Sequence, residues 1–215
     1  MSTRAKICGI TSGAALEAAI AGGASHIGLV FYARSPRYVD PATARRLADQ
    51  ARGRVRVVAL VVDADDAAIA DIVAAVHPDM LQLHGKETPA RVAAIRAIAG
   101  LPVIKAVAVA SADDVRRAAD YAEVADLILF DAKPPAAALP GGNGVAFDWS
   151  LMAPVTGRMP FMLSGGLTPE TVQEAIRVTQ APWVDVSSGV EAVPGEKDPV
   201  LIRRFLEAVK TANQT

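Results

Sequence analysis

Short apolar runs alternate along this chain with longer segments that mix alanine with charged residues. The runs are hydrophobic at nearly every position, as in parallel strands covered on both faces, whereas the intervening segments have the composition of helices. This pattern predicts strands at Ala5–Cys8, His26–Phe31, Arg56–Val62, Met80–Leu83, Val103–Val107, Leu127–Asp131, Phe161–Leu163 and Trp183–Val186.

A helix is predicted after each strand. Several begin with a polar capping residue followed by proline, as in Asp40-Pro41, Thr168-Pro169 and Asp198-Pro199. Proline is favoured at the first helical position because the missing N–H needs no acceptor there. The predicted helices are Gly13–Gly22, Pro41–Ala51, Asp65–Val76, Pro89–Ala99, Ala112–Tyr121, Asp148–Met152, Pro169–Thr179 and Pro199–Lys210.

Eight successive strand–helix units predict an α/β fold, with a parallel sheet closed into a (β/α)8 TIM barrel rather than an open sheet. The 215 residues give room for one substantial core, and no linker divides them. We therefore expect a single barrel domain over residues 1–215. The Pro-, Ala- and Gly-rich stretch from Lys133 to Gly144 follows the sixth strand and has the length of a mobile lid over an active site.

Composition excludes several classes of protein. The net charge is -1 and no block of Lys and Arg is present, so a nucleic-acid partner is not expected. The single cysteine cannot form an internal disulfide, which fits a reducing compartment. No apolar run approaches the ~20 residues of a membrane span, and the first residues lack the apolar core of a signal peptide. We expect a cytoplasmic protein without a membrane partner.

Chemistry in such a barrel gathers at the C-terminal ends of the strands. Cys8 ends the first strand and Asp131 ends the sixth. Taken singly, a cysteine is most often a small buried hydrophobe and a carboxylate at this place a cap. Taken together, a thiol and a carboxyl group three strands apart would flank one small substrate as base and acid, which suits isomerisation.

Two glycine-rich segments, Ser164–Leu167 and Ser187–Val190, follow the seventh and eighth strands. Barrels often bind phosphate there through backbone N–H groups, although each segment alone is also typical of an ordinary tight turn. Glycines 141, 142 and 144 would add further N–H groups, or would make the long loop flexible.

The remaining polar candidates each have a structural alternative. Arg34 and Arg37 follow the second strand, where an arginine would hold a substrate carboxylate or simply face solvent. His84 ends the fourth strand and would contact substrate or bind neighbouring loops, while His26 and His77 are assigned to structure. The three histidines lack the spacing of metal ligands, so no metal is expected.

An ordered set of motifs resembles the phosphoribosylanthranilate isomerase family of tryptophan biosynthesis over essentially the whole chain. The resemblance implies a barrel enzyme without metal or cofactor, whose partner is a small phosphosugar. The implied reaction is the Amadori rearrangement of N-(5-phospho-β-D-ribosyl)anthranilate to 1-(2-carboxyphenylamino)-1-deoxy-D-ribulose 5-phosphate. The matching motifs are Lys6-Ile7-Cys8-Gly9-Ile10-Thr11, Gly28-Leu29-Val30-Phe31, Ser35-Pro36-Arg37, Leu81-Gln82-Leu83-His84-Gly85, Phe147-Asp148-Trp149-Ser150, Leu163-Ser164-Gly165-Gly166-Leu167 and Asp185-Val186-Ser187-Ser188-Gly189-Val190-Glu191.

The resemblance also implies roles for individual residues. Asp131 would protonate the furanose ring oxygen, and Cys8 would then remove the proton from the sugar C2, for which it needs a cationic neighbour or hydrogen-bond donors that favour its thiolate. Arg34 matches the position that binds the anthranilate carboxylate, and His84 and Asp185 fall on other active-site positions. The phosphate-binding positions match Gly142, Gly144, Ser164, Gly165, Gly166, Ser187, Ser188 and Gly189.

One loop departs from the family pattern. Asn143 stands where Thr or Ser is expected and Val145 where Lys is frequent, so only backbone contacts are expected from this loop. Family members occur as monomers and dimers. We expect a monomer, with a homodimer as the alternative.

Other interpretations remain open. A ribulose-phosphate epimerase would need a His/Asp metal site that the chain lacks, and Lys105 is the one indication of the Lys/Glu arrangement of an indole-glycerol-phosphate synthase. A dual-substrate relative that also acts in the histidine pathway would typically carry Asp in place of Cys8. A non-catalytic barrel that binds a phosphorylated ligand would keep the glycine loops without needing Cys8 and Asp131 as a pair.

Overall fold

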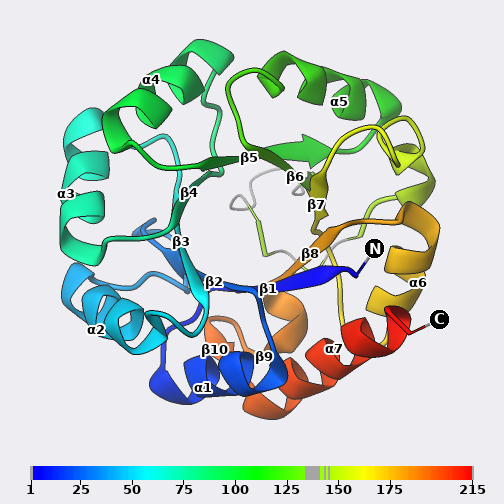
Figure 1. Ribbon diagram of the computed structural model, residues 1–215, viewed down its shortest axis with the longest axis horizontal. Helices are drawn as coiled ribbons and strands as arrows, with labels where there is room; N and C mark the ends of the chain where they lie inside the picture. The colour runs from blue at the N-terminus through cyan, green and yellow to red at the C-terminus, as the bar shows by residue number, and fades with distance from the viewer. Residues whose placement is uncertain (1, 134–140, 143, 145, 215) are drawn as a thin grey trace.

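Eight parallel strands form a closed barrel in which each strand pairs with the next and β8 pairs with β1 (Figure 1). The computed structural model describes residues 2–133, 141, 142, 144 and 146–214. The predicted (β/α)8 architecture is confirmed. The strands are β1 (Arg4–Cys8), β2 (His26–Val30), β3 (Arg56–Val61), β4 (Met80–Leu83), β5 (Val103–Val109), β6 (Leu127–Ala132), β7 (Phe161–Leu163) and β8 (Trp183–Val186).

Helices surround the barrel and cover its outer face (Figure 1). The caps predicted at Asp40 and Asp198 act as expected, whereas Thr168 does not cap α6. The Asp40 carboxylate accepts hydrogen bonds from the N–H groups of Ala42 and Thr43, with Pro41 at the first position of the helix. The α-helices are α1 (Gly13–Gly22), α2 (Pro41–Ala51), α3 (Asp66–Val76), α4 (Pro89–Ala99), α5 (Ala112–Arg117), α6 (Val172–Thr179) and α7 (Pro199–Ala212).

Three predicted helices differ in the structure. The helix predicted at Asp148–Met152 is only a 3-10 turn, η2 (Trp149–Met152), because Pro154 has no N–H to continue an α-helix. The fifth helix divides into α5 and the 3-10 helix η1 (Ala118–Tyr121). α6 begins at Val172 rather than Pro169, since Thr168 and Thr171 bond to each other in a local turn before it.

Side chains alternate between the barrel interior and the helix layer, as the two-residue period of a strand requires. Outward-facing residues such as Ile7, Ile27 and Leu29 pack against Leu16, Leu47 and Phe205 of the helices. Apolar side chains form one layer of the barrel interior, and the polar residues Gln82 and Asp131 lie nearer its C-terminal end. That apolar layer contains Val58, Met80, Ile104, Ala106, Leu127, Leu129 and Met162, with Trp183 packed against it.

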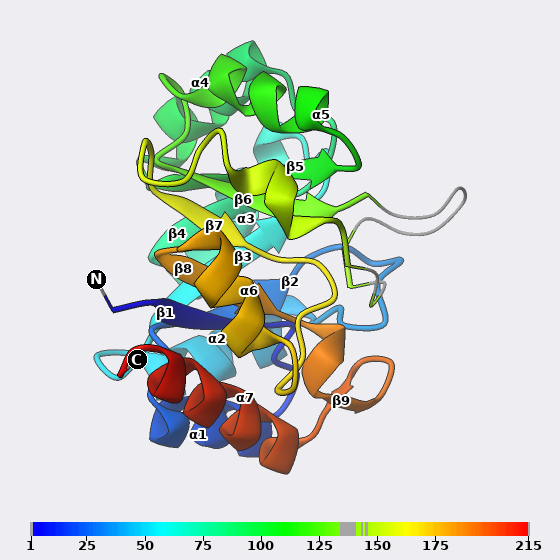
Figure 2. The same cartoon turned by 90° about the vertical axis from the view of Figure 1, so that its right-hand side faces the viewer.

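A short 3-10 helix and a β-hairpin between β8 and α7 were not predicted. They are η3 (Ser188–Val190), β9 (Glu191–Val193) and β10 (Glu196–Lys197). The hairpin packs closely against the loop after β2: a Cβ at Gly195 would clash with the Pro36 carbonyl oxygen. It is also bonded to the turn after β1, where Thr11 Oγ1 donates to the Gly195 carbonyl at 3.3 Å. It lies on the side of the barrel away from the N-terminus (Figure 2).

Part of the loop after β6 lies outside the described residues. The predicted lid between Lys133 and Gly144 includes 134–140 and Asn143, and Val145 follows it, so these predictions concern residues that are not described. The single-domain prediction likewise extends to Met1 and Thr215, which are not described. Within the described residues, no helix is both long and apolar enough to cross a membrane.

Candidate active site

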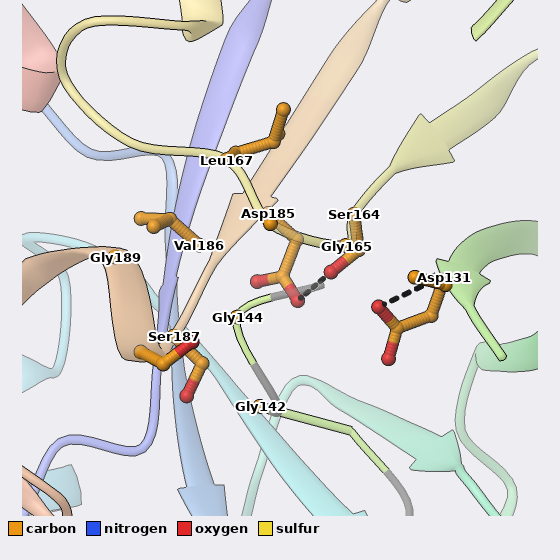
Figure 3. A pocket seen from close by; sticks show the side chains of 13 residues that line it. Asp131, Gly142, Gly144, Ser164, Gly165, Leu167, Asp185, Val186, Ser187 and Gly189 are labelled. Atoms are coloured by element: carbon orange, nitrogen blue, oxygen red, sulfur yellow. Dashed lines mark hydrogen bonds between the residues drawn. The ribbon is translucent and has the colours of Figure 1, made fainter. Parts of the chain in front are cut away.

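A pocket with about 340 Å³ of empty space opens at the C-terminal ends of β6, β7 and β8 (Figure 3). Its wall is formed by the turns after β7 and β8 and by glycines of the loop after β6. Every residue predicted to bind phosphate lies in this wall, and so do Asp131 and Asp185. The pocket is lined by Asp131, Ala132, Gly142, Gly144, Ser164, Gly165, Gly166, Leu167, Asp185, Val186, Ser187, Ser188 and Gly189.

The wall offers backbone donors to an anion. The N–H groups of Gly165, Gly166 and Gly189 have no backbone acceptor among the described residues. Gly165 has a φ of +88°, and a Cβ there would lie 2.6 Å from the Ala132 nitrogen, so only glycine lets this turn pass so close to β6. Successive free N–H groups in such turns form anion-binding concavities.

Cys8 lies beside a buried lysine. Lys6 and Cys8 share the inner face of β1, and both face Gly28 on β2: a Cβ at Gly28 would lie 2.9 Å from Cys8 Sγ and 3.3 Å from Lys6 Nζ. Lys6 is completely buried and its ammonium forms a 2.9 Å ion pair with Asp185 on β8. Lys6 is therefore the cationic neighbour that a thiolate at Cys8 requires.

The charges around Cys8 act in opposite directions. Burial raises the pKa of the Cys8 thiol above its ordinary value, and the Asp185 carboxylate adds to this. The ammonium groups of Lys6 and Lys197 lower the pKa but only partly offset the burial. For Lys6, burial lowers the pKa, but Asp185 and the Cys8 thiolate outweigh it and hold the pKa above its ordinary value. Lys6 thus stays charged next to the sulfur.

Asp131 extends into the pocket from the end of β6, opposite Asp185 and Ser164 (Figure 3). Its Oδ1 accepts a hydrogen bond from the Ala132 N–H at 3.0 Å, and its Oδ2 lies 3.2 Å from Nε2 of His84. Gly141 covers this pair, since a Cβ there would be 2.9 Å from the His84 Nε2. The structure thus connects His84 to the pocket through Asp131.

The structure brings Arg37, and not Arg34, to the site. Arg34 is exposed and has no hydrogen bond or ion pair among the described residues. Arg37 is 9% exposed, and its Cδ would lie 2.8 Å from a Cβ at Gly9, the residue after Cys8. Its Nε and Nη2 donate to Glu191 at 2.7 and 2.8 Å, and Nη2 also donates to the Gly142 carbonyl at 3.2 Å. Geometry therefore favours Arg37 as the guanidinium of this site.

Lys197, on the unpredicted hairpin, connects the turn after β8 to Glu191, the partner of Arg37. Its side chain is fully buried, and Nζ donates to the Ser187 carbonyl at 3.0 Å and to Glu191 at 2.5 Å. Ser187 Oγ in turn donates to the carbonyl of Cys8 at 3.2 Å. Burial lowers the pKa of Lys197, although Glu191 opposes the effect. No spacing in the sequence marked Glu191 or Lys197, because their partners Arg37 and Ser187 lie in the loops after β2 and β8.

Other candidates have structural places. His26 is buried, with its ring edge-on to Trp183, and His77 is the exposed residue that ends α3. Lys105 points out of the barrel toward Tyr121 and pairs with Glu87 at 2.7 Å, so it does not supply the lysine of an indole-glycerol-phosphate synthase. Within the described ranges, no three His, Cys, Asp or Glu side chains come together as metal ligands.

Comparison with known proteins agrees with this geometry. The family model of N-(5'phosphoribosyl)anthranilate (PRA) isomerase matches residues 5–208. Two proteins named N-(5'-phosphoribosyl)anthranilate isomerase are each 55% identical to this chain. The one from Rhodopseudomonas palustris (strain BisA53) aligns over 97% of this chain and 96% of its own length, and the one from Paracoccus denitrificans (strain Pd 1222) over 96% of both.

Solved structures of this family superpose on the whole barrel. The crystal structure of phosphoribosyl anthranilate isomerase from Thermotoga maritima has a TM-score of 0.87 at 40% identity, covering 97% of this chain and 99% of its own. A crystal structure of the isomerase in complex with reduced 1-(o-carboxyphenylamino)-1-deoxyribulose 5-phosphate has a TM-score of 0.84 at 39% identity, with the same coverage. The chain therefore belongs to the N-(5'-phosphoribosyl)anthranilate isomerase family.

Proposed function

We propose that this barrel performs the isomerisation of its family with Asp131 as the general acid and Cys8 as the general base. The substrate is N-(5-phospho-β-D-ribosyl)anthranilate and the product is 1-(2-carboxyphenylamino)-1-deoxy-D-ribulose 5-phosphate, an intermediate of tryptophan biosynthesis. The observation that carries the proposal is the placement of a carboxyl group on β6 and a thiol on β1 at the same end of one barrel. Asp131 lines the glycine-rich pocket, and Cys8 lies beside Lys6, whose ammonium pairs with Asp185 of the same pocket.

Ring opening is the acid's step. Asp131 gives its proton to the furanose ring oxygen while the C1–O bond breaks, and the anilino nitrogen lone pair forms the C1=N bond of a Schiff base. A proton transfer of this kind by a positioned side chain accelerates a reaction about 10²- to 10⁴-fold. The His84 imidazole beside Oδ2 supports the carboxylate that remains on Asp131.

The base then acts on C2. The Cys8 thiolate removes the C2 proton, the electrons of that C–H bond form C1=C2, and those of C1=N return to nitrogen. The enolamine tautomerises to the ketone of the product. The cations at Lys6 and Lys197 favour the thiolate form against the effect of burial.

The two anionic ends of the substrate have separate binding regions. We place the phosphate on the backbone of Gly142, Gly144, Gly165, Gly166 and Gly189, with Ser164, Ser187 and Ser188 beside it. We place the anthranilate carboxylate at Arg37 rather than Arg34, since Arg37 is the arginine held next to Gly9. Glu191 occupies Nε and Nη2 of Arg37, which leaves Nη1 for the substrate.

The setting of the reaction is also part of the proposal. We propose a monomeric, cytoplasmic enzyme with a single barrel domain, which uses no metal or cofactor and has a small phosphosugar as its partner. The lone buried cysteine is consistent with a reducing compartment. A homodimer is the alternative assembly.

The deciding experiment follows the fluorescence of phosphoribosylanthranilate with EDTA present. Wild-type protein should consume the substrate, while Asp131→Asn and Cys8→Ala should each lose at least ~10²-fold in kcat. Circular dichroism shows whether each variant is folded. Turnover that disappears with EDTA would contradict a metal-free reaction, and folded wild-type protein without turnover would leave a phosphate-binding barrel.

A further inference from the structure

Three polar side chains form a hydrogen-bonded chain across the barrel mouth. Gln82 Nε2 lies 2.9 Å from Nδ1 of His84, and His84 Nε2 lies 3.2 Å from Oδ2 of Asp131. Gln82 is completely buried, and only about a tenth of the His84 and Asp131 side chains is exposed. Gln82 belongs to β4 and Asp131 to β6, so this series of hydrogen bonds must pass across β5, the strand between them.

The inner face of β5 explains how the imidazole reaches across. Ala106 lies among the interior residues, and the alternation of the strand puts Ala108 on the same face. Because the side chains of Ala106 and Ala108 are small, they leave room for the His84 imidazole to extend from β4 to β6. The outward positions between and beside them carry Lys105 and Val107.

The order of donors and acceptors fixes the tautomer. A carboxylate only accepts hydrogen bonds, and a neutral imidazole has one donor and one acceptor nitrogen. Once Asp131 has given up its proton, its carboxylate only accepts, so the hydrogen between it and His84 must lie on Nε2. Nδ1 then requires a donor, and the Gln82 amide nitrogen provides one. If the Gln82 amide were flipped, its oxygen would face Nδ1 of His84 and favour hydrogen on Nδ1. The Nε2 lone pair would then point toward the Asp131 carboxylate.

Among the residues that the structure describes, the Gln82 amide has no other hydrogen-bonded contact. Its Oε1 is buried without a partner in the described part of the chain. An unpaired buried acceptor costs about 1–3 kcal/mol, which a methionine of similar shape would avoid. The amide therefore contributes nothing to the interior except its hydrogen bond to His84.

We infer that Gln82 is a positioning residue that sets the Nε2–H tautomer of His84, so that His84 donates a hydrogen bond to Asp131. The inference rests on the proposed role of Asp131 as the acid. When Asp131 releases its proton to the ring oxygen, the negative charge forms on a carboxylate that already faces a donor. This hydrogen bond strengthens as the charge develops, so it stabilises the transition state of ring opening more than the bound substrate.

The first test reads the tautomer directly. Nitrogen NMR of the histidine rings, with the His84 signals assigned by their loss in His84→Gln, should show hydrogen on Nε2 alone in the wild-type protein. Gln82→Met removes the donor to Nδ1 at similar volume and should abolish this single-tautomer state. Hydrogen on Nδ1 of the wild type, alone or with Nε2, would overturn the inference.

The second test separates positioning from packing. Gln82→Met should lower kcat ~10-fold with KM within ~2-fold of wild type, and its thermal stability should not fall. His84→Gln places an amide N–H near the former Nε2–H and should retain more kcat than His84→Asn, whose side chain is too short. Unchanged kcat in Gln82→Met, or His84→Asn as active as His84→Gln, would count against the inference.

Failure of this inference is distinguishable from failure of the proposed function. If Asp131→Asn keeps its turnover, the acid itself is wrongly assigned. If Asp131→Asn is inactive and wild-type His84 nevertheless carries hydrogen on Nδ1, the acid stands and only the role of Gln82 is wrong.

Discussion

The ammonium of Lys6 is enclosed between the carboxylate of Asp185, 2.9 Å away on the neighbouring strand, and the thiol of Cys8 on its own strand. Lys6 is 0% exposed and Asp185 is 3% exposed. A buried ion pair of this kind repays its desolvation only with good geometry, and removal of one partner leaves an uncompensated charge. The pair therefore links the pKa of Cys8 to the stability of the barrel.

Replacing this lysine should affect both properties. Lys6→Met removes the cation that lowers the pKa of Cys8, so the limb of the pH–rate profile that reports deprotonation of the base should move to higher pH. Unfolding in urea should also show a loss of roughly 3–5 kcal/mol from the unpaired Asp185. The double variant Lys6→Met/Asp185→Asn should regain part of the stability. It should reverse only part of the shift in the pH profile, because Asp185 raises the pKa of Cys8 by less than Lys6 lowers it. A profile identical to wild type would show that Lys6 does not act on the thiol.

Two arginines in the loop after β2 should behave differently. Arg37→Lys loses the two-pronged contact with Glu191 and the planar group offered to a carboxylate, so KM should rise ~10-fold or more. Arg34→Lys is the matched control and should leave KM within ~2-fold, because Arg34 is exposed. Steady-state kinetics on both variants decides between them, and a larger effect at Arg34 would restore the assignment made from the sequence.

Gly141 should tolerate no side chain. Its φ is +73°, and a Cβ would lie 2.9 Å from His84 Nε2, so Gly141→Ala should displace the imidazole and lower kcat by ~10-fold or more. Gly157 has a similar φ of +71° with nothing within 4 Å, which makes Gly157→Ala the control for backbone strain alone. That control should lose about 1 kcal/mol of stability and keep its kcat. Equal kcat values in the two variants would show that contact with His84 is unimportant.

Stability should fall in mild acid because of His26. Burial, together with the charges of Lys6, Arg56 and Arg4, lowers the pKa of His26 from 6.5 to about 4 in the folded protein. Between these values the unfolded chain binds more protons, so folding loses up to about 3 kcal/mol as the pH falls from about 6.5 to about 4. His26→Phe should remove this part of the pH dependence. Urea unfolding of both proteins at pH about 7 and about 4.5 measures the change in the free energy of unfolding with pH. An equal change in wild type and His26→Phe would refute the assignment.

The strands and the phosphate loops could be predicted because each depends on local sequence. A parallel strand buried on both faces is apolar throughout, and the glycine turns directly follow β7 and β8. The hairpin Glu191–Lys197 could not be predicted in the same way, because its packing partners Thr11 and Pro36 lie far away in the chain.

Side-chain direction was the harder part of the site. Arg34 and Arg37 lie in one loop, and the turns closed by the N–H groups of Ser35 and Tyr38 decide which arginine faces inward. Loop residues have no periodic pattern of inward and outward positions, so the sequence does not indicate the direction of either side chain. Gln82 lies within an apolar strand, and its role depends on a carboxylate two strands away. Lys6, a charged residue inside an apolar run and in phase with Cys8, is the signal in the sequence that points to a cation beside the thiol.

The anchoring of Lys197 under the turn after β8 has a consequence for how the enzyme is made. Cys8 is synthesised 179 residues before Ser187, which donates a hydrogen bond to its carbonyl and accepts one from Lys197. Glu191, which orients Arg37, also follows β8 in the chain. The surroundings of Cys8 and Arg37 therefore cannot form during translation until the turn after β8 and the hairpin β9–β10 have been synthesised.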